Sequence, residues 1–202
     1  MVDSDLVTAD SVAEDASIGD YAGITALATD ADGTDSVSYS LTSNPGNLFA
    51  INSTTGAITV NAALDAETAI SHAITVQALS TDGSTSTADF IISVTDVDEF
   101  DVGAISDSDA AGETVAEDIT VGSSVGITAS ATDLDVDDSV TYTLSDDAGG
   151  LFTIDNGAGI VTLANPLDYE SGTSHTITVV ATSTDTSTST RDFTITVTDV
   201  ND

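Results

Sequence analysis

The chain repeats itself once, with a constant offset of 103 residues. When residues 11–99 are aligned with residues 114–202, 47 of the 89 pairs are identical and the alignment needs no insertion or deletion. The identical positions include an alternation of apolar residues, some glycines and a set of acids. A gapless repeat of this length predicts two copies of one domain in tandem, which we place at residues 1–99 and 100–202.

Composition limits what each copy can be. A unit of about 100 residues can bury its own core but leaves no room for a large catalytic domain. The 202 residues include 35 acids and a single Lys or Arg, so the formal net charge is −34. The hydrophobic content of 40% is too high for a disordered acidic tail. The sequence therefore predicts a folded, anionic protein that repels nucleic acid and anionic lipid and attracts multivalent cations.

Several common features are missing from the sequence. It contains no cysteine, so disulfides cannot stabilise the fold. It contains no run of 18 apolar residues, which predicts no membrane span, and residues 1–5 show no signal peptide. The chain stops inside a repeated acidic motif, so we expect it to be part of a longer array of repeats.

The apolar residues alternate with small polar ones, which predicts strands rather than helices. Clusters of Gly, Asn and Asp between these segments predict turns. We expect about seven strands in the first copy, near residues 5–12, 22–28, 36–42, 48–52, 57–61, 71–79 and 87–96, and the same set plus 103 in the second. This pattern predicts an all-β fold of two tandem immunoglobulin-like Greek-key sandwiches.

The predicted core of the first copy consists of the apolar residues on one face of these strands, with their partners in the second copy: Ile24, Val37, Tyr39, Leu41, Phe49, Ile51, Leu64, Ile74, Val76, Phe90, Ile92 and Val94. His72 and His175 occupy equivalent positions at the start of a strand, which favours a structural role.

The repeated acids occur in closely spaced pairs. Asp30 and Asp32 flank one residue, as do Asp65 and Glu67, and both spacings recur in the second copy. Alternate residues of an extended chain point the same way, so each pair is expected to place two carboxylates on one side. Such carboxylates repel each other unless a divalent cation binds between them. Oxygen ligands from separate loops suit calcium better than magnesium, and the lack of Cys and scarcity of His disfavour zinc.

The acidic motifs, taken together, resemble the calcium motifs of cadherin repeats, especially those of bacterial cadherin-like domains. The motifs are 13–15 (AED), 30–32 (DAD), 64–67 (LDAE) and 96–99 (DVDE) in the first copy, and 116–118 (AED), 133–135 (DLD), 167–170 (LDYE) and 199–202 (DVND) in the second. One such motif is weak evidence, whereas four in register, twice, are specific.

The resemblance implies calcium ions at the junction between the two copies. The first copy and the linker would supply Glu14, Asp65, Glu67, Asp96, Asp98 and Glu99. The second copy would supply Asp133 and Asp135, with the carbonyl of Phe100 replacing a linker asparagine. Half-sites for further repeats would be formed by Asp30, Asp32, Glu117, Asp168, Glu170, Asp199, Asn201 and Asp202.

The sequence also departs from the family pattern. Ser80 and Ser183 stand where the family usually has an aspartate, and a hydroxyl is a poorer calcium ligand than a carboxylate. Asp185 is two positions further on and would substitute if the turn folds back.

The resemblance implies a non-enzymatic, calcium-binding module that calcium stiffens, acting as a spacer or adhesion segment of an extracellular or cell-surface protein. Its partners would be calcium, neighbouring repeats and other cadherin-like domains. We expect no catalysis, because no Ser/His/Asp constellation is present and no aromatic-lined cleft is predicted for paired acids to cleave a glycoside. Three alternatives remain open: calcium-dependent polysaccharide binding, calcium-dependent self-association, and simple solvation of the surface acids.

Overall fold

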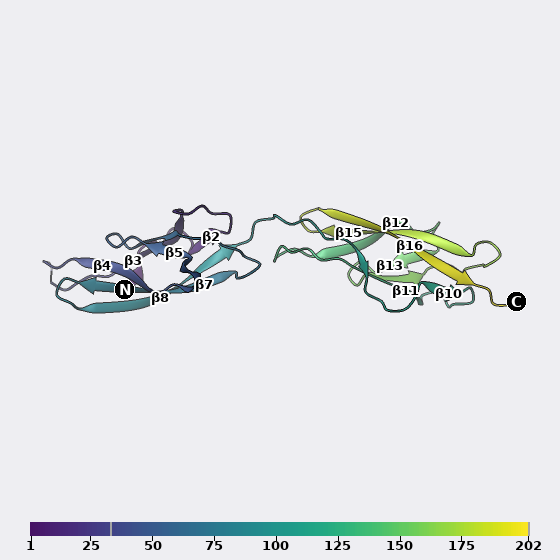
Figure 1. The fold of residues 1–202 in the computed structure, drawn as a ribbon, viewed down its shortest axis with the longest axis horizontal. Helices are drawn as coiled ribbons and strands as arrows, with labels where there is room; N and C mark the ends of the chain where they lie inside the picture. Colours follow the sequence, from purple (N-terminus) through teal and green to yellow (C-terminus); the bar gives the residue numbers. More distant parts are fainter. Residues whose placement is uncertain (33, 202) are drawn as a thin grey trace. The chain divides into compact units, whose positions relative to one another are not determined.

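The computed structural model describes residues 1–32 and 34–201, which divide into two compact units. Unit 1 spans Met1–Val97 and unit 2 spans Asp98–Asp202. Both units consist of strands arranged in two layers, as predicted (Figure 1). Among the described residues, the only helical segment is one short 3₁₀ turn, η1 (Pro45–Asn47), and no helix is long and apolar enough to cross a membrane.

The strands of unit 1 are β1 (Val2–Asp3), β2 (Ser11–Ala13), β3 (Tyr21–Leu27), β4 (Val37–Ser43), β5 (Phe49–Ile51), β6 (Ala57–Val60), β7 (Ser71–Ser80) and β8 (Thr85–Thr95). The strands of unit 2 are β9 (Ser106–Asp107), β10 (Thr114–Ala116), β11 (Ser124–Ser130), β12 (Val140–Asp146), β13 (Phe152–Ile154), β14 (Ile160–Leu163), β15 (Ser174–Ser183) and β16 (Thr188–Thr198).

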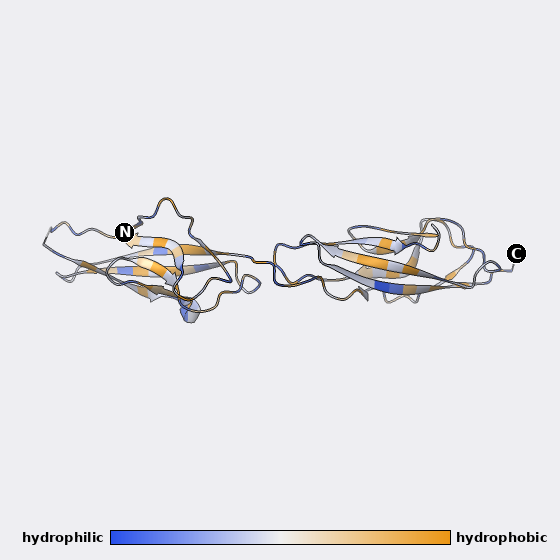
Figure 2. Ribbon diagram, turned by 90° about the horizontal axis from the view of Figure 1, so that it is seen from above, coloured by the Kyte–Doolittle hydropathy of each residue, from blue (hydrophilic) through white to orange (hydrophobic). Residues whose placement is uncertain are grey.

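Each unit contains two four-stranded sheets. In unit 1 their orders are β1-β3-β6-β5 and β2-β8-β7-β4, and unit 2 repeats both arrangements with β9-β11-β14-β13 and β10-β16-β15-β12. Neighbouring strands are antiparallel except for β2 with β8 and β10 with β16, which are parallel. In Figure 2, hydrophobic residues alternate with paler ones along the strands, as expected when one face of each sheet is buried.

The first predicted strand of each unit is wrong. Residues 5–12 do not form one strand, because the chain leaves the first sheet after β1 and joins the second at β2. Between them, the side chain of Asp5 accepts hydrogen bonds from the amides of Val7 and Thr8 and bends the backbone. Leu6 and Val7 are therefore 89% and 96% exposed. Predicted residues 108–115 divide in the same way into β9 and β10.

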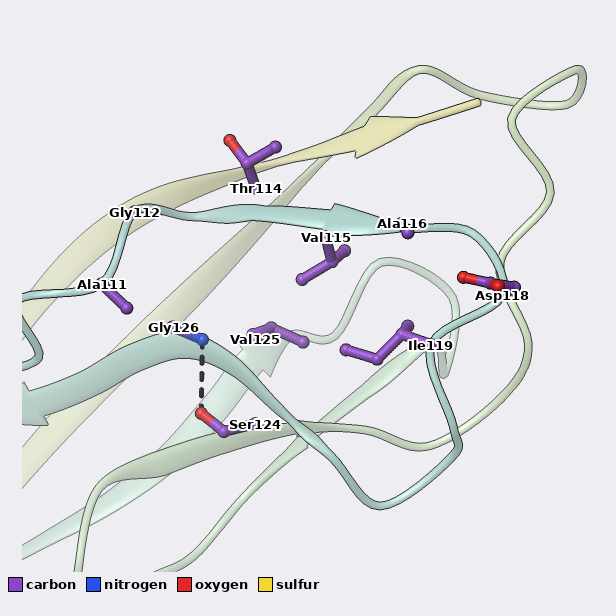
Figure 3. A pocket seen from close by; sticks show the side chains of 10 residues that line it. All are labelled: Ala111, Gly112, Thr114, Val115, Ala116, Asp118, Ile119, Ser124, Val125 and Gly126. Carbon is purple, nitrogen blue, oxygen red and sulfur yellow. Dashed lines mark hydrogen bonds between the residues drawn. The ribbon is translucent and has the colours of Figure 1, made fainter. Parts of the chain in front are cut away.

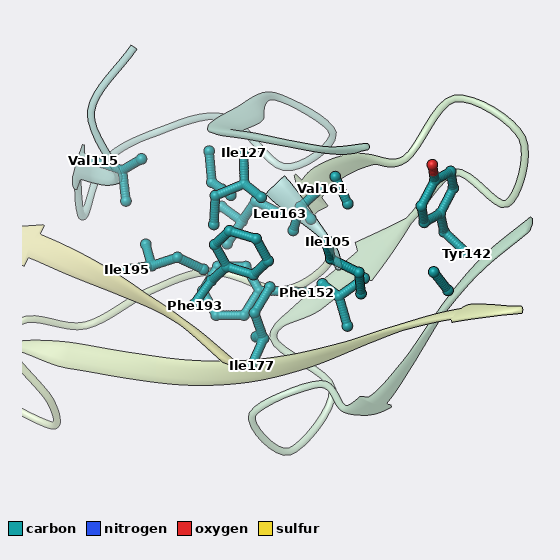
Figure 4. Close-up of a cluster of buried hydrophobic side chains, with 14 of the residues drawn as sticks. Ile105, Val115, Ile127, Tyr142, Phe152, Val161, Leu163, Ile177, Phe193 and Ile195 are labelled. Carbon is teal, nitrogen blue, oxygen red and sulfur yellow. The ribbon is translucent and has the colours of Figure 1, made fainter. Parts of the chain in front are cut away.

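Each unit has its own hydrophobic core between its sheets (Figure 4 shows that of unit 2). Of the twelve core residues predicted for unit 1, eight are buried and the other four are partly buried against them. The partly buried residues are Val37, Leu41, Ile51 and Phe90. Ile24 and its repeat partner Ile127 are completely buried. The period-two pattern therefore identified the side chains that hold the two sheets together.

Two repeated aromatic contacts brace the cores. The hydroxyl of Tyr39 accepts a hydrogen bond of 3.0 Å from the amide of Ala28, and Tyr142 does the same with Ala131 at 2.9 Å. His72 packs edge-on against Phe49 with 6.0 Å between ring centroids, and His175 lies equally far from Phe152. These contacts fit the structural role predicted for the histidines.

Candidate metal centre

At the C-terminal end of each unit, one glutamate ties three segments together. Glu14 follows β2 and is 8% exposed. Its Oε2 accepts a 2.7 Å hydrogen bond from the amide of Ala66, and its Oε1 accepts one of 2.8 Å from the amide of Val97, where the chain leaves unit 1. In unit 2, Glu117 binds the amides of Tyr169 and Val200 at the same two distances. Both carboxylates therefore hold the outgoing chain against the preceding loop.

The second acidic pair at this end lies in a turn, not in an extended stretch as the spacing suggested. The amide and hydroxyl of Thr68 donate to the two carboxylate oxygens of Asp65, at 2.7 and 2.9 Å. Ser171 makes the same contacts with Asp168, and its hydroxyl is the largest cause of the lowered pKa of Asp168, followed by its amide. The turn forms because these donors bond to the carboxylate three residues earlier.

The turn nevertheless gathers the predicted ligands. Oxygens of Glu117, Asp168 and Glu170 lie within 4.8 Å of one another in unit 2. Asp199 and Asn201 follow β16 and flank Val200, whose amide is bound by Glu117. In unit 1 the equivalent positions are held by Glu14, Asp65, Glu67 and Asp96. Asp202 lies outside the described residues.

At the N-terminal end of unit 2, Asp135 holds the incoming chain. Asp135 is 3% exposed, and its two carboxylate oxygens accept hydrogen bonds from the amides of Glu99 and Phe100, at 3.3 and 3.0 Å. Asp133 accepts a long hydrogen bond of 3.4 Å from the amide of Asp135. Asp135 therefore fixes the segment whose Phe100 carbonyl was predicted to bind calcium.

Other acids crowd the same end of unit 2. Oxygens of Asp98, Asp135 and Asp138 lie within 4.8 Å of one another. Desolvation raises the pKa of Asp98, and the charges of Asp185, Asp135 and Asp138 raise it further. Asp185 lies in the β15–β16 hairpin and accepts a hydrogen bond from the amide of Ser187. A cation at this end would remove the repulsion that disfavours the charged form of Asp98.

At the N-terminal end of unit 1, the predicted pair Asp30 and Asp32 is bent rather than extended, because the Asp32 amide donates to Asp30 Oδ1 at 3.0 Å. Oxygens of Asp30, Asp35 and Asp82 lie within 4.8 Å of one another. Sequence reasoning missed Asp35 and Asp82, as well as Asp138 in unit 2. The repeat could have identified them, since Asp35 and Asp82 recur as Asp138 and Asp185 with the same offset of 103.

The donor set fits a hard divalent cation. At both ends the gathered groups are carboxylates, with amides and hydroxyls beside them, and no cysteine exists in the chain. The one Lys or Arg of the chain, Arg191, is engaged elsewhere: it donates a 3.0 Å hydrogen bond to the carbonyl of Ile105 and lies 4.7 Å from the ring centroid of Phe193. Oxygen-only ligands of this kind are those that calcium prefers.

A groove of about 410 Å³ lies beside β10 and β11 in unit 2 (Figure 3). Small and apolar side chains such as Val115, Ile119 and Val125 line it, and Asp118 is its one charged residue. Ser124 lines the groove and accepts a 3.2 Å hydrogen bond from the amide of Gly126, whereas unit 1 has Tyr21 at the equivalent position. With a single titratable side chain among its ten lining residues, the groove offers no acid–base pair for catalysis.

The family model "Cadherin domain" matches the chain twice, over residues 10–95 and 113–198. The chain belongs to the cadherin family. Human Protocadherin Fat 1 is 32% identical over 184 residues, which cover 87% of this chain and 4% of that protein. Human Protocadherin Fat 4 is 34% identical over 148 residues, which cover 72% of this chain and 3% of that protein. The chain thus spans only a few per cent of the length of these relatives.

Solved cadherin structures share the fold of the tandem pair. The crystal structure of mouse Cadherin-23 EC22-24 aligns with a TM-score of 0.67 and 23% identity, covering 96% of this chain and 64% of that one. The extracellular domain of Protocadherin GammaB4 aligns with a TM-score of 0.71 and 22% identity, covering 95% and 31%. Both confirm the predicted pair of tandem cadherin-like sandwiches.

Proposed function

We propose that this tandem cadherin pair binds calcium where one unit follows the next, and that calcium limits the motion of one unit against the other. The observation that carries the proposal is the repetition of two acidic sets, one at each end of a unit. The C-terminal set gathers Glu117, Asp168 and Glu170 within 4.8 Å, and the N-terminal set of unit 2 gathers Asp98, Asp135 and Asp138. In an array, the C-terminal set of one unit would meet the N-terminal set of the next.

The hydrogen bonds inside each unit support this function. Glu14 and Asp135 hold the chain on either side of the unit boundary, through the amides of Val97 and of Glu99 and Phe100 respectively. The ligands would therefore sit on backbone that each unit already fixes, which lowers the ordering cost of binding. Calcium would neutralise carboxylates that have no basic residue to pair with.

Calcium titration of the full chain tests the proposal. We expect Glu67→Ala and Asp135→Ala each to weaken calcium binding, because each removes a carboxylate from one side of the shared site. Asp192→Ala is a matched control, since Asp192 is exposed on the β16 strand and accepts a hydrogen bond from Thr178 instead. Isothermal titration would show unchanged isotherms for Glu67→Ala or Asp135→Ala if the shared site does not exist.

We further propose that the pair is a non-enzymatic segment of an extracellular or cell-surface adhesion protein, in which calcium-stiffened repeats act as a spacer. Its partners would be calcium, the neighbouring repeats and other cadherin domains. The support is the match of both repeats to the cadherin family and their similarity to the protocadherins.

Polysaccharide binding is less well supported by the described surface. Among the described residues, the aromatic side chains classed as exposed are Tyr21 and Phe100, each 38% exposed. They belong to different units, so neither unit presents a pair of rings on which a sugar could stack. Pull-down on insoluble polysaccharide with and without chelator would detect such binding, and sedimentation at several calcium concentrations would detect self-association.

A further inference from the structure

The N-terminal end of unit 1 carries an acidic cluster that extends beyond the repeated pairs. Oxygens of Asp30, Asp35 and Asp82 lie within 4.8 Å of one another. Asp35 precedes β4, and Asp82 lies in the hairpin between β7 and β8. All three belong to unit 1, and that unit contains no Lys or Arg, since Arg191 belongs to unit 2. The cluster therefore lacks a basic side chain that could neutralise it.

A buried hydroxyl points toward this cluster. Ser80 is 7% exposed and, with Asp30 and Ser84, lines a cavity of about 80 Å³. It lies near enough to the Asp30 carboxylate to be the largest cause of the lowered pKa of Asp30, ahead of the amide of Asp32. By distance and angle, however, Ser80 Oγ makes no hydrogen bond to any described residue. A buried hydroxyl without a partner is costly, and a ligand in the cavity would relieve that cost.

Unit 2 repeats these features. Ser183 is 4% exposed and its Oγ also makes no hydrogen bond within the described chain. The hydroxyl of Thr81 donates a 2.8 Å hydrogen bond to Asp35, and Thr184 donates in the same way to Asp138. A polar group buried without a partner in both repeats indicates a shared cause rather than an isolated packing defect.

We propose that Asp30, Asp35 and Asp82, together with the Ser80 hydroxyl, bind one calcium ion within unit 1. In this site the hairpin residue Asp82 supplies the carboxylate that residue 80 does not. The ligands come from two loops and a strand end, which suits the flexible coordination of calcium better than the strict octahedron of magnesium. The site lies inside one unit, so it does not depend on the calcium proposed between units.

Hydrogen bonds already orient two of the proposed ligands. Asp35 Oδ1 accepts from Thr81, and Asp82 Oδ1 accepts a 2.8 Å hydrogen bond from the amide of Ser84. The Thr81 hydroxyl in turn accepts a 3.3 Å hydrogen bond from the amide of Ser36. Such outer contacts fix the direction of a carboxylate and support metal binding by the carboxylates they hold.

Isothermal titration of the full chain with calcium chloride tests this site. Asp35→Asn and Asp82→Asn keep an oxygen that can accept the hydrogen bond from Thr81 or Ser84 but remove the charge. We expect each to lose one bound calcium per chain or to weaken one site by about tenfold or more, because the charge of the ligand set controls affinity. Asp89→Asn is the control, since Asp89 lies on the exposed face of β8 and bonds to Thr75. If the Asp82→Asn isotherm matches that of Asp89→Asn, the proposal is wrong.

A second measurement separates this site from the one between the units. In the Glu67→Ala variant, calcium should still shift the amide NMR signals of residues 80–84, whereas adding Ser80→Ala should weaken that response. If residues 80–84 do not respond in Glu67→Ala, the site within unit 1 does not exist, whatever the result at the junction. If they respond while Glu67→Ala leaves the overall isotherm unchanged, the junction proposal fails and this one stands.

Discussion

At the scale of single residues, acids do two different jobs in this protein. Glu14 and Glu117 are braced by two backbone amides each, at 2.7 and 2.8 Å. Asp30, Asp35 and Asp82 instead crowd together near a hydroxyl that has no hydrogen-bond partner. The first kind stabilises the fold without metal, whereas the second invites a cation. Sequence spacing alone does not separate them, since both kinds repeat with the offset of 103.

The brace formed by Glu14 can be tested without calcium. Glu14→Gln leaves one oxygen to accept a hydrogen bond but turns the other into a donor that faces a backbone amide. We expect the free energy of unfolding of unit 1 to fall by about 1–3 kcal/mol, the cost of leaving a buried donor unsatisfied. Urea unfolding in the presence of chelator measures it. Asp89→Gln, an exposed control on β8, should change stability little, and an equal effect of both variants would refute the brace.

Asp5 makes stability depend on pH in the acid range. Hydrogen bonds, first from the amide of Thr8 and then from that of Val7, lower the pKa of Asp5 from 3.8 to about 2. A lowered pKa contributes stability above pH 3.8 that is lost as the pH falls through about 2. Between pH 4 and pH 2, wild type should therefore lose more stability than Asp5→Asn, as measured by urea unfolding at each pH. Parallel pH dependence in the two proteins would contradict this role.

At the scale of elements, the division of the first strand depends on a close backbone contact. Gly23 in β3 has φ +82, and a Cβ there would lie 2.0 Å from the carbonyl oxygen of Ala9, just before β2. Gly126 has the same φ in unit 2, and its Cβ would lie 2.7 Å from the carbonyl oxygen of Gly112. Glycine lets the crossing chain pass directly over the neighbouring strand.

Two glycine substitutions separate steric overlap from backbone strain. Gly19 also has a positive φ, +100, but a Cβ there would meet nothing within 4 Å. Gly19→Ala should therefore cost about 1–3 kcal/mol of stability from backbone strain alone, and Gly23→Ala should cost clearly more. Chemical denaturation of both variants measures the difference. Equal losses would mean that the crossing segment moves away freely and that the contact is not needed.

At the scale of the whole molecule, charge sets the response to calcium. A net charge of −34 on 202 residues opposes the compact state, and bound calcium would relieve part of that repulsion. One ion at about 100 times its Kd stabilises a protein by roughly 2.7 kcal/mol. We therefore expect chelation to lower the melting temperature in calorimetry, and sodium chloride to stabilise the chelated protein more than the calcium-loaded one. A melting temperature that does not respond to chelator would contradict calcium binding at every site proposed above.

The sequence by itself determined the repeat, the all-β class, most of the core and the positions of the acids, because these follow from periodicity and spacing along one chain. It did not reveal that residues 5–12 divide between two sheets, or that Asp65 and Glu67 lie in a turn. It also did not bring Asp82 to Asp30, which is 52 residues earlier. Those features depend on contacts between segments far apart in the sequence, such as Gly23 against Ala9 and the β7–β8 hairpin against the loop before β4, and only the folded chain brings them together.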